Sequence, residues 1–323
     1  MAGSLIACLC FVGRAPLAKA AEPTDTQPAS QSADAREPRV ADFAPGVRIN
    51  WERRQVELQA RVVLREGLLE LFACSPQTRE HESIVVVRAR PLRIFEALGL
   101  VGLTPGAPVR FDETSESFWP AYGDPTSIEV RYERDGEPVT ADISEWMVQT
   151  SDGRTMLPHY WVFAGSRRFE GDRFGADLEG TIICVVDFDT ALVALPQSYS
   201  SSNDELWLAA KTDAIPPLGT DCTLILKAAD VTKLAADVLP GGKLSDGGHE
   251  VSAEKLAERF KQQTTGRHGA LLMIRVDPKA TRADVSTAVG ALLRSGVPEV
   301  SLQIVPREKP APQSQPALRE GGE

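Results

Sequence analysis

The sequence predicts an α+β protein with a strand-rich first domain containing few helices, followed by a small β-α-β-containing domain. Two-residue alternation of apolar and polar side chains recurs through the first two thirds of the 323-residue chain, as expected for half-buried strands. The last third instead combines a continuous apolar run with two segments of helical periodicity. All five tryptophans precede residue 210, which assigns the aromatic core to the first domain.

Strand signals in the first domain begin at residues 47–51 and continue through residues 56–62. Asp135-Gly136 lies between two later runs and favours a tight hairpin turn. One helix is expected from Pro91, because proline suits the first helical position, to about Gly99. The other strands are expected at residues 69–73, 84–89, 128–132, 160–163, 182–188 and 223–226.

The small domain has a regular alternation of elements. Ser252 is placed to cap a helix, and the apolar run at 270–276 is typical of a strand buried on both faces. Residues 281–284 resemble a capping box that begins a second helix, which Gly296 can end in the left-handed conformation. Residues 300–305 then return as a strand, which completes a β-α-β unit.

Composition and pattern together divide the chain. Residues 21–44 are rich in Ala, Pro, Ser, Thr and Gln without apolar periodicity, as in flexible linkers. The expected segments are a signal peptide at 1–20, a disordered linker at 21–44, a strand-rich domain at 45–228, a linker or hairpin at 229–247, a small domain at 248–305 and a disordered tail at 306–323.

The amino-terminal segment predicts export. Residues 5–12 are apolar but too few to span a bilayer, and Ala18-Lys19-Ala20 fits a small-x-small cleavage site. We therefore expect a periplasmic or otherwise exported protein. In the alternative, residues 5–8 form a lipoprotein box and Cys8 carries a lipid anchor, which would be the sole membrane attachment. A net charge of −10 with scattered basic residues argues against a nucleic-acid partner.

Two groups of residues are candidate sites. Cys74, His81 and Glu82, with Glu80 beside them, bring thiolate, imidazole and carboxylate within nine residues and could bind a divalent metal such as zinc. A structural or surface role is the alternative. Asp187-Phe188-Asp189 could present paired carboxylates where a strand ends, or it could be an ordinary strand-terminating turn.

No familiar catalytic signature is complete. The chain lacks a Gly-x-Ser-x-Gly elbow, a P-loop, a dinucleotide fingerprint and a Cys-x-x-Cys pair, so it is not assigned to an enzyme class and a non-catalytic role is favoured. After signal removal, Cys74, Cys184 and Cys222 allow at most one internal disulfide. Cys74 and Cys222 are the candidate pair, whereas Cys184 lies in an apolar run typical of a buried thiol.

Longer motifs give a family resemblance for the first domain. They are Leu64-Arg65-Glu66-Gly67, Leu69-Glu70-Leu71-Phe72, Cys74, Thr78-Arg79-Glu80-His81-Glu82-Ser83, Trp161-Val162-Phe163-Ala164-Gly165-Ser166, Val186-Asp187-Phe188, Ala194-Leu195-Pro196 and Ile215-Pro216-Pro217-Leu218-Gly219-Thr220. On these motifs, residues 47–227 resemble the YdjY-like family of uncharacterised exported bacterial proteins. The resemblance implies a domain without implying a chemistry.

The small domain has shorter motifs. They are Val251-Ser252 with Leu256, Ile274-Arg275-Val276-Asp277, Asp284-Val285, Gly296-Val297 and Val300-Ser301-Leu302. On these, residues 248–305 resemble the ExbD/TolR periplasmic domain, which implies a packing, dimerisation or cell-wall interaction module.

These observations predict an exported envelope protein whose biochemical activity the motifs leave undefined. Its first domain is expected to bind a ligand or protein, and its second domain to mediate assembly, including homodimer formation. The expected partners are envelope proteins or cell-wall components. The alternative is a metal-binding protein or metal-dependent enzyme that uses the Cys74, His81 and Glu82 region.

Overall fold

A computed structural model describes residues 39–112, 117–157, 160–264 and 269–307. The expected signal peptide, Cys8 and most of the linker and tail lie outside these residues. The described part is strand-rich and contains four α-helices, in agreement with the predicted α+β class. Among the described helices, none is both long and apolar enough to cross a membrane.

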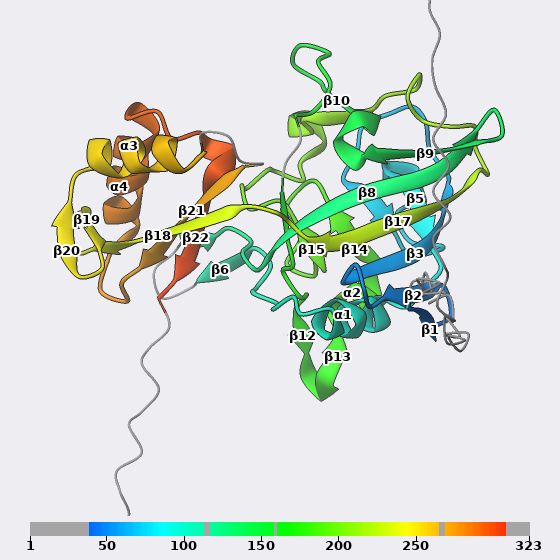
Figure 1. Ribbon diagram of the computed structural model, residues 1–323, viewed down its shortest axis with the longest axis horizontal. Coiled ribbons are helices and arrows are strands. Elements are labelled where there is room, and N and C mark those ends of the chain that lie inside the picture. Colours follow the sequence, from blue (N-terminus) through cyan, green and yellow to red (C-terminus); the bar gives the residue numbers. More distant parts are fainter. Residues whose placement is uncertain (1–38, 113–116, 158–159, 265–268, 308–323) are drawn as a thin grey trace, which may run out of the picture. The chain divides into compact units, whose positions relative to one another are not determined.

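Eight strands close into a barrel (Figure 1). In order around the barrel they are β3 (Gln55–Val62), β17 (Asp221–Ala228), β8 (Pro125–Arg134), β11 (Trp161–Val162), β15 (Val193–Ala194), β14 (Thr181–Cys184), β4 (Leu71–Cys74) and β5 (Ser83–Val87). Pairing of β5 with β3 completes the closure. The β14–β15 and β4–β5 pairs are parallel, whereas the other pairs are antiparallel.

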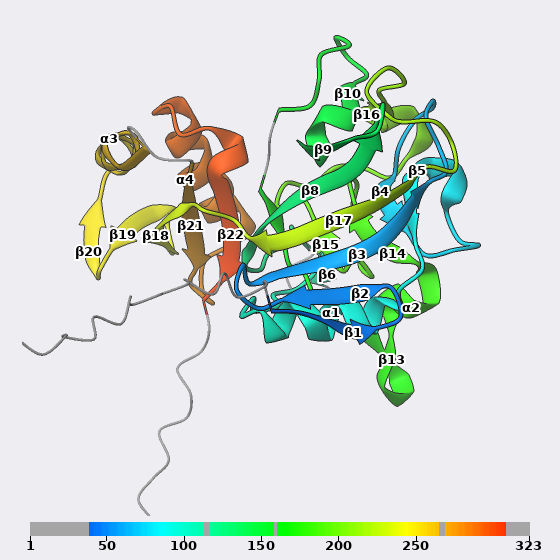
Figure 2. The same ribbon diagram turned by 45° about the vertical axis from the view of Figure 1, so that its right-hand side comes forward.

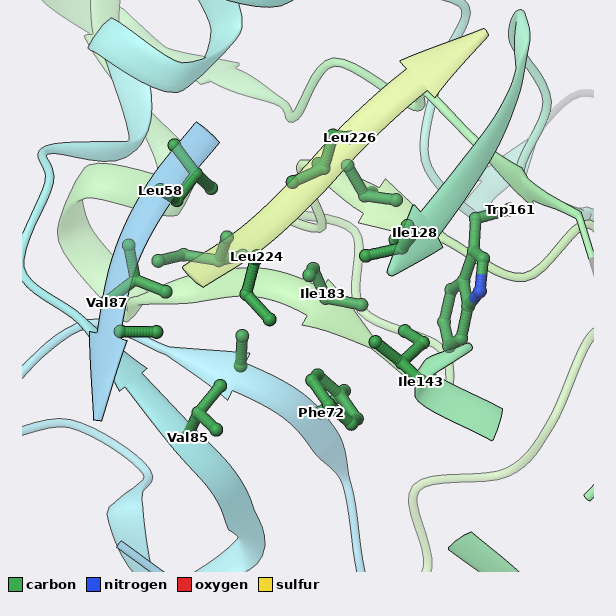
Figure 3. Packing of buried hydrophobic residues seen from close by; sticks show 14 of the residues in the cluster. Leu58, Phe72, Val85, Val87, Ile128, Ile143, Trp161, Ile183, Leu224 and Leu226 are labelled. Atoms are coloured by element: carbon green, nitrogen blue, oxygen red, sulfur yellow. The ribbon is translucent and has the colours of Figure 1, made fainter. Parts of the chain in front are cut away.

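Side-chain alternation explains why the barrel has an apolar interior. Leu58 on β3, Leu224 on β17 and Ile128 on β8 belong to one buried cluster with Phe72 and Trp161 (Figure 3). Successive side chains of a strand point to opposite faces, so the intervening residues of these strands face outward. Burying so many large apolar side chains is the main favourable contribution to the barrel's stability.

Two strands extend the sheet beyond β3. These are β1 (Val40–Ala44) and β2 (Val47–Asn50), which pair antiparallel around Gly46 at a φ of +75°. The predicted linker at 21–44 is therefore wrong at its end. Residues 40–44 form a strand because Phe43 and Ala44 pack against the core and β2 supplies hydrogen-bonding partners.

The predicted hairpin and first helix are confirmed. The turn between β8 and β9 (Glu137–Asp142) has positive φ at both Asp135 and Gly136, as a type I′ turn requires. Helix α1 (Pro91–Leu100) has proline at its start and buries Ile94 and Leu98 against the barrel.

Shorter elements complete this part of the chain. Three short strand pairs are β6 (Arg110–Asp112) with β7 (Ser117–Trp119), β10 (Met147–Gln149) with β16 (Leu208–Ala210), and β12 (Arg168–Phe169) with β13 (Arg173–Phe174). Helix α2 spans Gly175–Glu179. The described 3-10 turns are η1 (Glu80–Glu82), η2 (Ile143–Trp146), η3 (Glu170–Asp172), η4 (Asn203–Glu205) and, after the first domain, η5 (Glu299–Ser301).

A second sheet has five strands in the order β20 (His249–Val251), β19 (Lys243–Asp246), β18 (Thr232–Leu239), β21 (Ala270–Val276) and β22 (Leu302–Pro306) (Figure 2). Strands β18, β21 and β22 are parallel neighbours. Helices α3 (Ala253–Thr264) and α4 (Arg282–Arg294) pack on one face, where they share an apolar cluster with the sheet. The segment 229–247 therefore supplies the β18–β19 hairpin of this same sheet, with β18 at its centre.

Local signals fix the ends of α4. The Thr281 hydroxyl accepts the Asp284 N–H at 3.2 Å, while the Asp284 carboxylate accepts the Thr281 N–H at 2.7 Å, so the predicted capping box is present. Gly296 has a φ of +90° and ends the helix as expected. Strand β22 includes Pro306, so the predicted disordered tail begins too early by at least that residue.

Candidate functional site

The three described cysteines are buried free thiols. Cys74 lies on β4 and Cys222 on β17, and the two strands are not neighbours in the barrel. The expected Cys74–Cys222 disulfide is therefore wrong. Burial raises the pKa of Cys74, against the opposing effect of hydrogen bonds with Ser83 and Thr78. Burial also raises the pKa of Cys222 to about 12, so these thiols are poor nucleophiles and poor metal ligands.

The candidate zinc ligands are not brought together. The Cys74 side chain is buried, whereas the His81 side chain is 74% exposed on η1. Glu80 accepts a hydrogen bond from the Gln77 N–H at 2.9 Å, and the Glu82 carboxylate lies 3.7 Å from the His81 imidazole. Across the described ranges, no group of three or more His, Cys, Asp and Glu could hold a metal ion. The residues present do not fit zinc.

The Glu80–Glu82 turn instead supports a carboxylate cluster that the sequence analysis did not find. Arg79 lies 2.6 Å from the Glu70 carboxylate and 4.0 Å from that of Glu82, and its guanidinium stacks over the Phe188 ring at 4.6 Å. Burial raises the pKa of Glu70, as do its hydrogen bond and charge repulsion with Glu82, while Arg79 lowers it. Only 6% of Glu70 is exposed, so its carboxylate interacts with Arg79 and Glu82 and has little access to a ligand. The cluster therefore holds η1 against the barrel.

The carboxylates of Asp187 and Asp189 do not converge. Asp189 pairs with Arg167 at 2.6 Å. Asp187 is half-buried, and burial raises its pKa to about 6 against hydrogen bonds from the Tyr199 backbone and Ser198. The expected pair of carboxylates therefore serves two separate local contacts.

A polar groove crosses the outer wall of the barrel. It has a volume of about 760 Å³ and is lined by residues on or beside β5, β3, β17, β8 and β9. Strands β3, β17 and β8 lie side by side in Figures 1 and 2, and β5 pairs with β3. Cross-strand register places Asp221 opposite Arg61, and Thr223 opposite both Gln59 and Arg131. These outward side chains line the groove together with Arg88, which follows β5. The volume is that of an ordinary small-ligand site.

The arginines of this groove differ in their partners. Arg61 pairs with Asp221 at 2.8 Å, and both side chains are exposed. Arg131 pairs at 3.0 Å with the nearly buried Glu57. Exposed Arg88 makes no hydrogen bond or ion pair with any residue that the structure describes, but after Arg61 its charge contributes to lowering the pKa of Asp221. The groove therefore offers one guanidinium that can bind a ligand without first breaking a hydrogen bond or ion pair.

The groove was not predicted from the sequence because its residues come from five strands. Polar residues at alternate positions from Gln55 to Arg61 did indicate one outward face. The pairing that sets this face beside β17 joins residues 160 positions apart, as for Arg61 and Asp221. The alternation of polar and apolar residues within one strand does not show which distant strand pairs with it.

The fold and groove define a class of protein: a closed barrel of mixed strands with a polar groove on its wall, followed by a two-layer α/β unit. The model of the YdjY domain family matches residues 47–227, more than half of the chain, and the chain belongs to that family. The predicted YdjY resemblance is thus confirmed. Neither the curated proteins nor the solved structures include a match to the chain.

Proposed function

We propose that this chain is an exported envelope protein in which the YdjY barrel is a ligand- or protein-binding module and the second sheet mediates assembly. The observation that carries the proposal is the polar groove, which has the volume of a ligand site and contains a guanidinium in no described hydrogen bond or ion pair. The described thiols are instead buried, and the carboxylates of Glu70 and Asp189 are held by Arg79 and Arg167. A binding role therefore has more support than a catalytic or metal-dependent one.

The proposed location is the periplasm or another exported compartment, with a lipid anchor at Cys8 as the alternative. Its support is the apolar run and cleavage pattern of the amino-terminal segment. The proposed partners are envelope proteins or cell-wall components.

The assembly role rests on the resemblance of residues 248–305 to the ExbD/TolR periplasmic domain. Strand β20 lies at one edge of its sheet, where unpaired backbone groups can add a strand from another chain. Homodimer formation through this unit is therefore part of the proposal, and sedimentation velocity of the full chain over a range of concentrations tests it.

Cell fractionation and co-sedimentation test the main proposal. The expressed full chain is expected in the exported fraction, with a mature amino terminus at Ala21 by mass spectrometry. Purified mature protein is then sedimented with isolated envelopes. Gln59→Trp, which fills the groove, is expected to abolish co-sedimentation, whereas Arg154→Trp on an exposed loop should not. Retention of the unprocessed chain in the cytoplasm would contradict export, and unchanged sedimentation of Gln59→Trp would contradict binding in the groove.

A further inference from the structure

The groove has a charge pattern that selects among ligands. Its lining holds three arginines against the carboxylates of Asp221 and Glu133, so its formal net charge is +1. Arg61 and Arg131 are already in ion pairs with carboxylates, which leaves Arg88 as the groove arginine without a described hydrogen bond or ion pair, although its charge also acts on Asp221. Such a surface suits a ligand with isolated negative charges. A dense polyanion would need clustered, unpaired cations.

The remaining lining residues indicate what carries the negative charge. Gln59, Thr220 and Thr223 can donate and accept hydrogen bonds, which matches the amides of a peptide. Tyr132 is the aromatic residue among the described residues that line the groove, but it is 5% exposed and its hydroxyl accepts a hydrogen bond from Arg134. A sugar ring would therefore find no open aromatic face on which to stack.

We propose that this groove binds an acidic peptide, with Arg88 pairing to a ligand carboxylate. This inference rests on the proposed binding function and specifies its ligand class. A planar guanidinium can bind a carboxylate through two parallel hydrogen bonds, and an exposed arginine retains this capacity.

The Arg61–Asp221 pair provides a substitution that should strengthen binding, in contrast to the loss of Arg88. Both side chains are exposed, so their pairing contributes little to stability and can be exchanged for a ligand. Hydrogen bonding to Arg61 lowers the pKa of Asp221, which keeps this carboxylate charged and in competition with a ligand carboxylate. Removing its charge is expected to strengthen binding.

The test is fluorescence anisotropy of the mature full chain with a labelled hexapeptide of alternating glutamate and glycine. Arg88→Gln is expected to weaken binding about tenfold, the effect of losing one charge-assisted hydrogen bond of about 1.4 kcal/mol. Asp221→Asn is expected to strengthen it about threefold, within the range of an exposed ion pair. The affinity of Arg88→Lys for the peptide should lie between those of wild type and Arg88→Gln, because lysine keeps the positive charge but lacks the paired N–H donors of the guanidinium.

Controls separate this ligand class from others. Arg154→Gln removes an arginine outside the groove and should leave binding unchanged. A glutamine–glycine hexapeptide should bind at least tenfold more weakly, and tripolyphosphate should compete less well than the unlabelled glutamate peptide. Wild-type affinity in Arg88→Gln, equal affinity for the glutamine peptide, or stronger competition by tripolyphosphate would overturn the proposal. Unfolding curves confirm that each exposed substitution leaves the barrel folded.

The envelope experiment separates failure of the ligand class from failure of the binding function of the groove. If Gln59→Trp abolishes envelope binding while the peptide does not bind wild type, the ligand class is wrong and the groove function stands. If Gln59→Trp binds envelopes normally and Arg88→Gln does not alter peptide binding, both proposals fail.

Discussion

Replacing Arg79 tests the interpretation of the Glu70 cluster as a structural fastening. Arg79→Met would keep an unbranched apolar side chain but remove the guanidinium, which lies over the Phe188 ring and 2.6 Å from a carboxylate of which 6% is exposed. Leaving a fully buried charge without its ionic partner lowers the free energy of unfolding by about 3–5 kcal/mol, and losing a hydrogen bond to a charged group lowers it by about 1.5–3 kcal/mol. Since the Arg79 side chain is 34% exposed, we expect a loss of about 2 kcal/mol in the free energy of unfolding near pH 8.

The pH dependence of this loss has a defined sign. The pKa of Glu70 is above its ordinary value of 4.5 in the folded chain, first because of burial and then because of Glu82. The folded state therefore binds more protons, and stability falls as pH rises from about 4.5 through the raised folded pKa. Arg79→Met removes the interaction that lowers this pKa. Its deficit should accordingly be smaller at pH 5 than at pH 8.

Urea denaturation followed by tryptophan fluorescence is a suitable assay, because all five tryptophans lie between residues 51 and 207 and report on the YdjY domain. Arg154→Met removes an exposed arginine whose pair with Asp152 is 3.4 Å long, and it should change stability by less than about 0.5 kcal/mol. Adding Glu70→Gln to Arg79→Met should recover much of the loss. Equal deficits in the single and double variants, or a deficit independent of pH, would refute the interpretation.

Three further predictions concern the core, the thiols and the metal alternative. Leu224→Ala empties a fully buried position and should destabilise the barrel by about 2–5 kcal/mol in the same urea assay, whereas a loss below about 1 kcal/mol would contradict the packing. Cys74, Cys184 and Cys222 should react with a thiol reagent at pH 8 only after unfolding, because each is buried, and rapid labelling of the native chain would disagree. Elemental analysis of protein from its native envelope should find no stoichiometric metal, and a metal lost in a Cys74→Ser, His81→Ala variant would restore the zinc hypothesis.

Local sequence signals predicted local structure well. The Asp135-Gly136 turn and the Thr281 capping box depend on residues within four positions of one another, and both are present. Barrel closure depends on pairs such as Ala60 with Val87 and Leu58 with Leu224, whose sequence separations carry no local signal. Strand β1 escaped prediction because it is a short edge strand with no fully buried residue, and its pairing with β2 is not visible in its own pattern.

Closeness in sequence was a poor guide to the site. Cys74 and His81 are seven residues apart, but one lies in the barrel's apolar wall and the other is exposed on a 3-10 turn. The groove arginines, in contrast, are separated by tens of residues and meet through strand register. Charge and alternation indicated outward faces, and only the three-dimensional pairing joined those faces into a groove.

Arginine labelling with phenylglyoxal shows which surface of the YdjY barrel its natural partner covers, and so determines whether the partner binds in the groove. Mature full-length protein would be labelled with and without a solubilised envelope fraction, and modified sites quantified by mass spectrometry. Binding in the groove predicts that labelling of Arg88 falls while that of Arg154 is unchanged. Unchanged labelling of Arg88, under conditions in which the protein is bound to the envelope fraction, would contradict it.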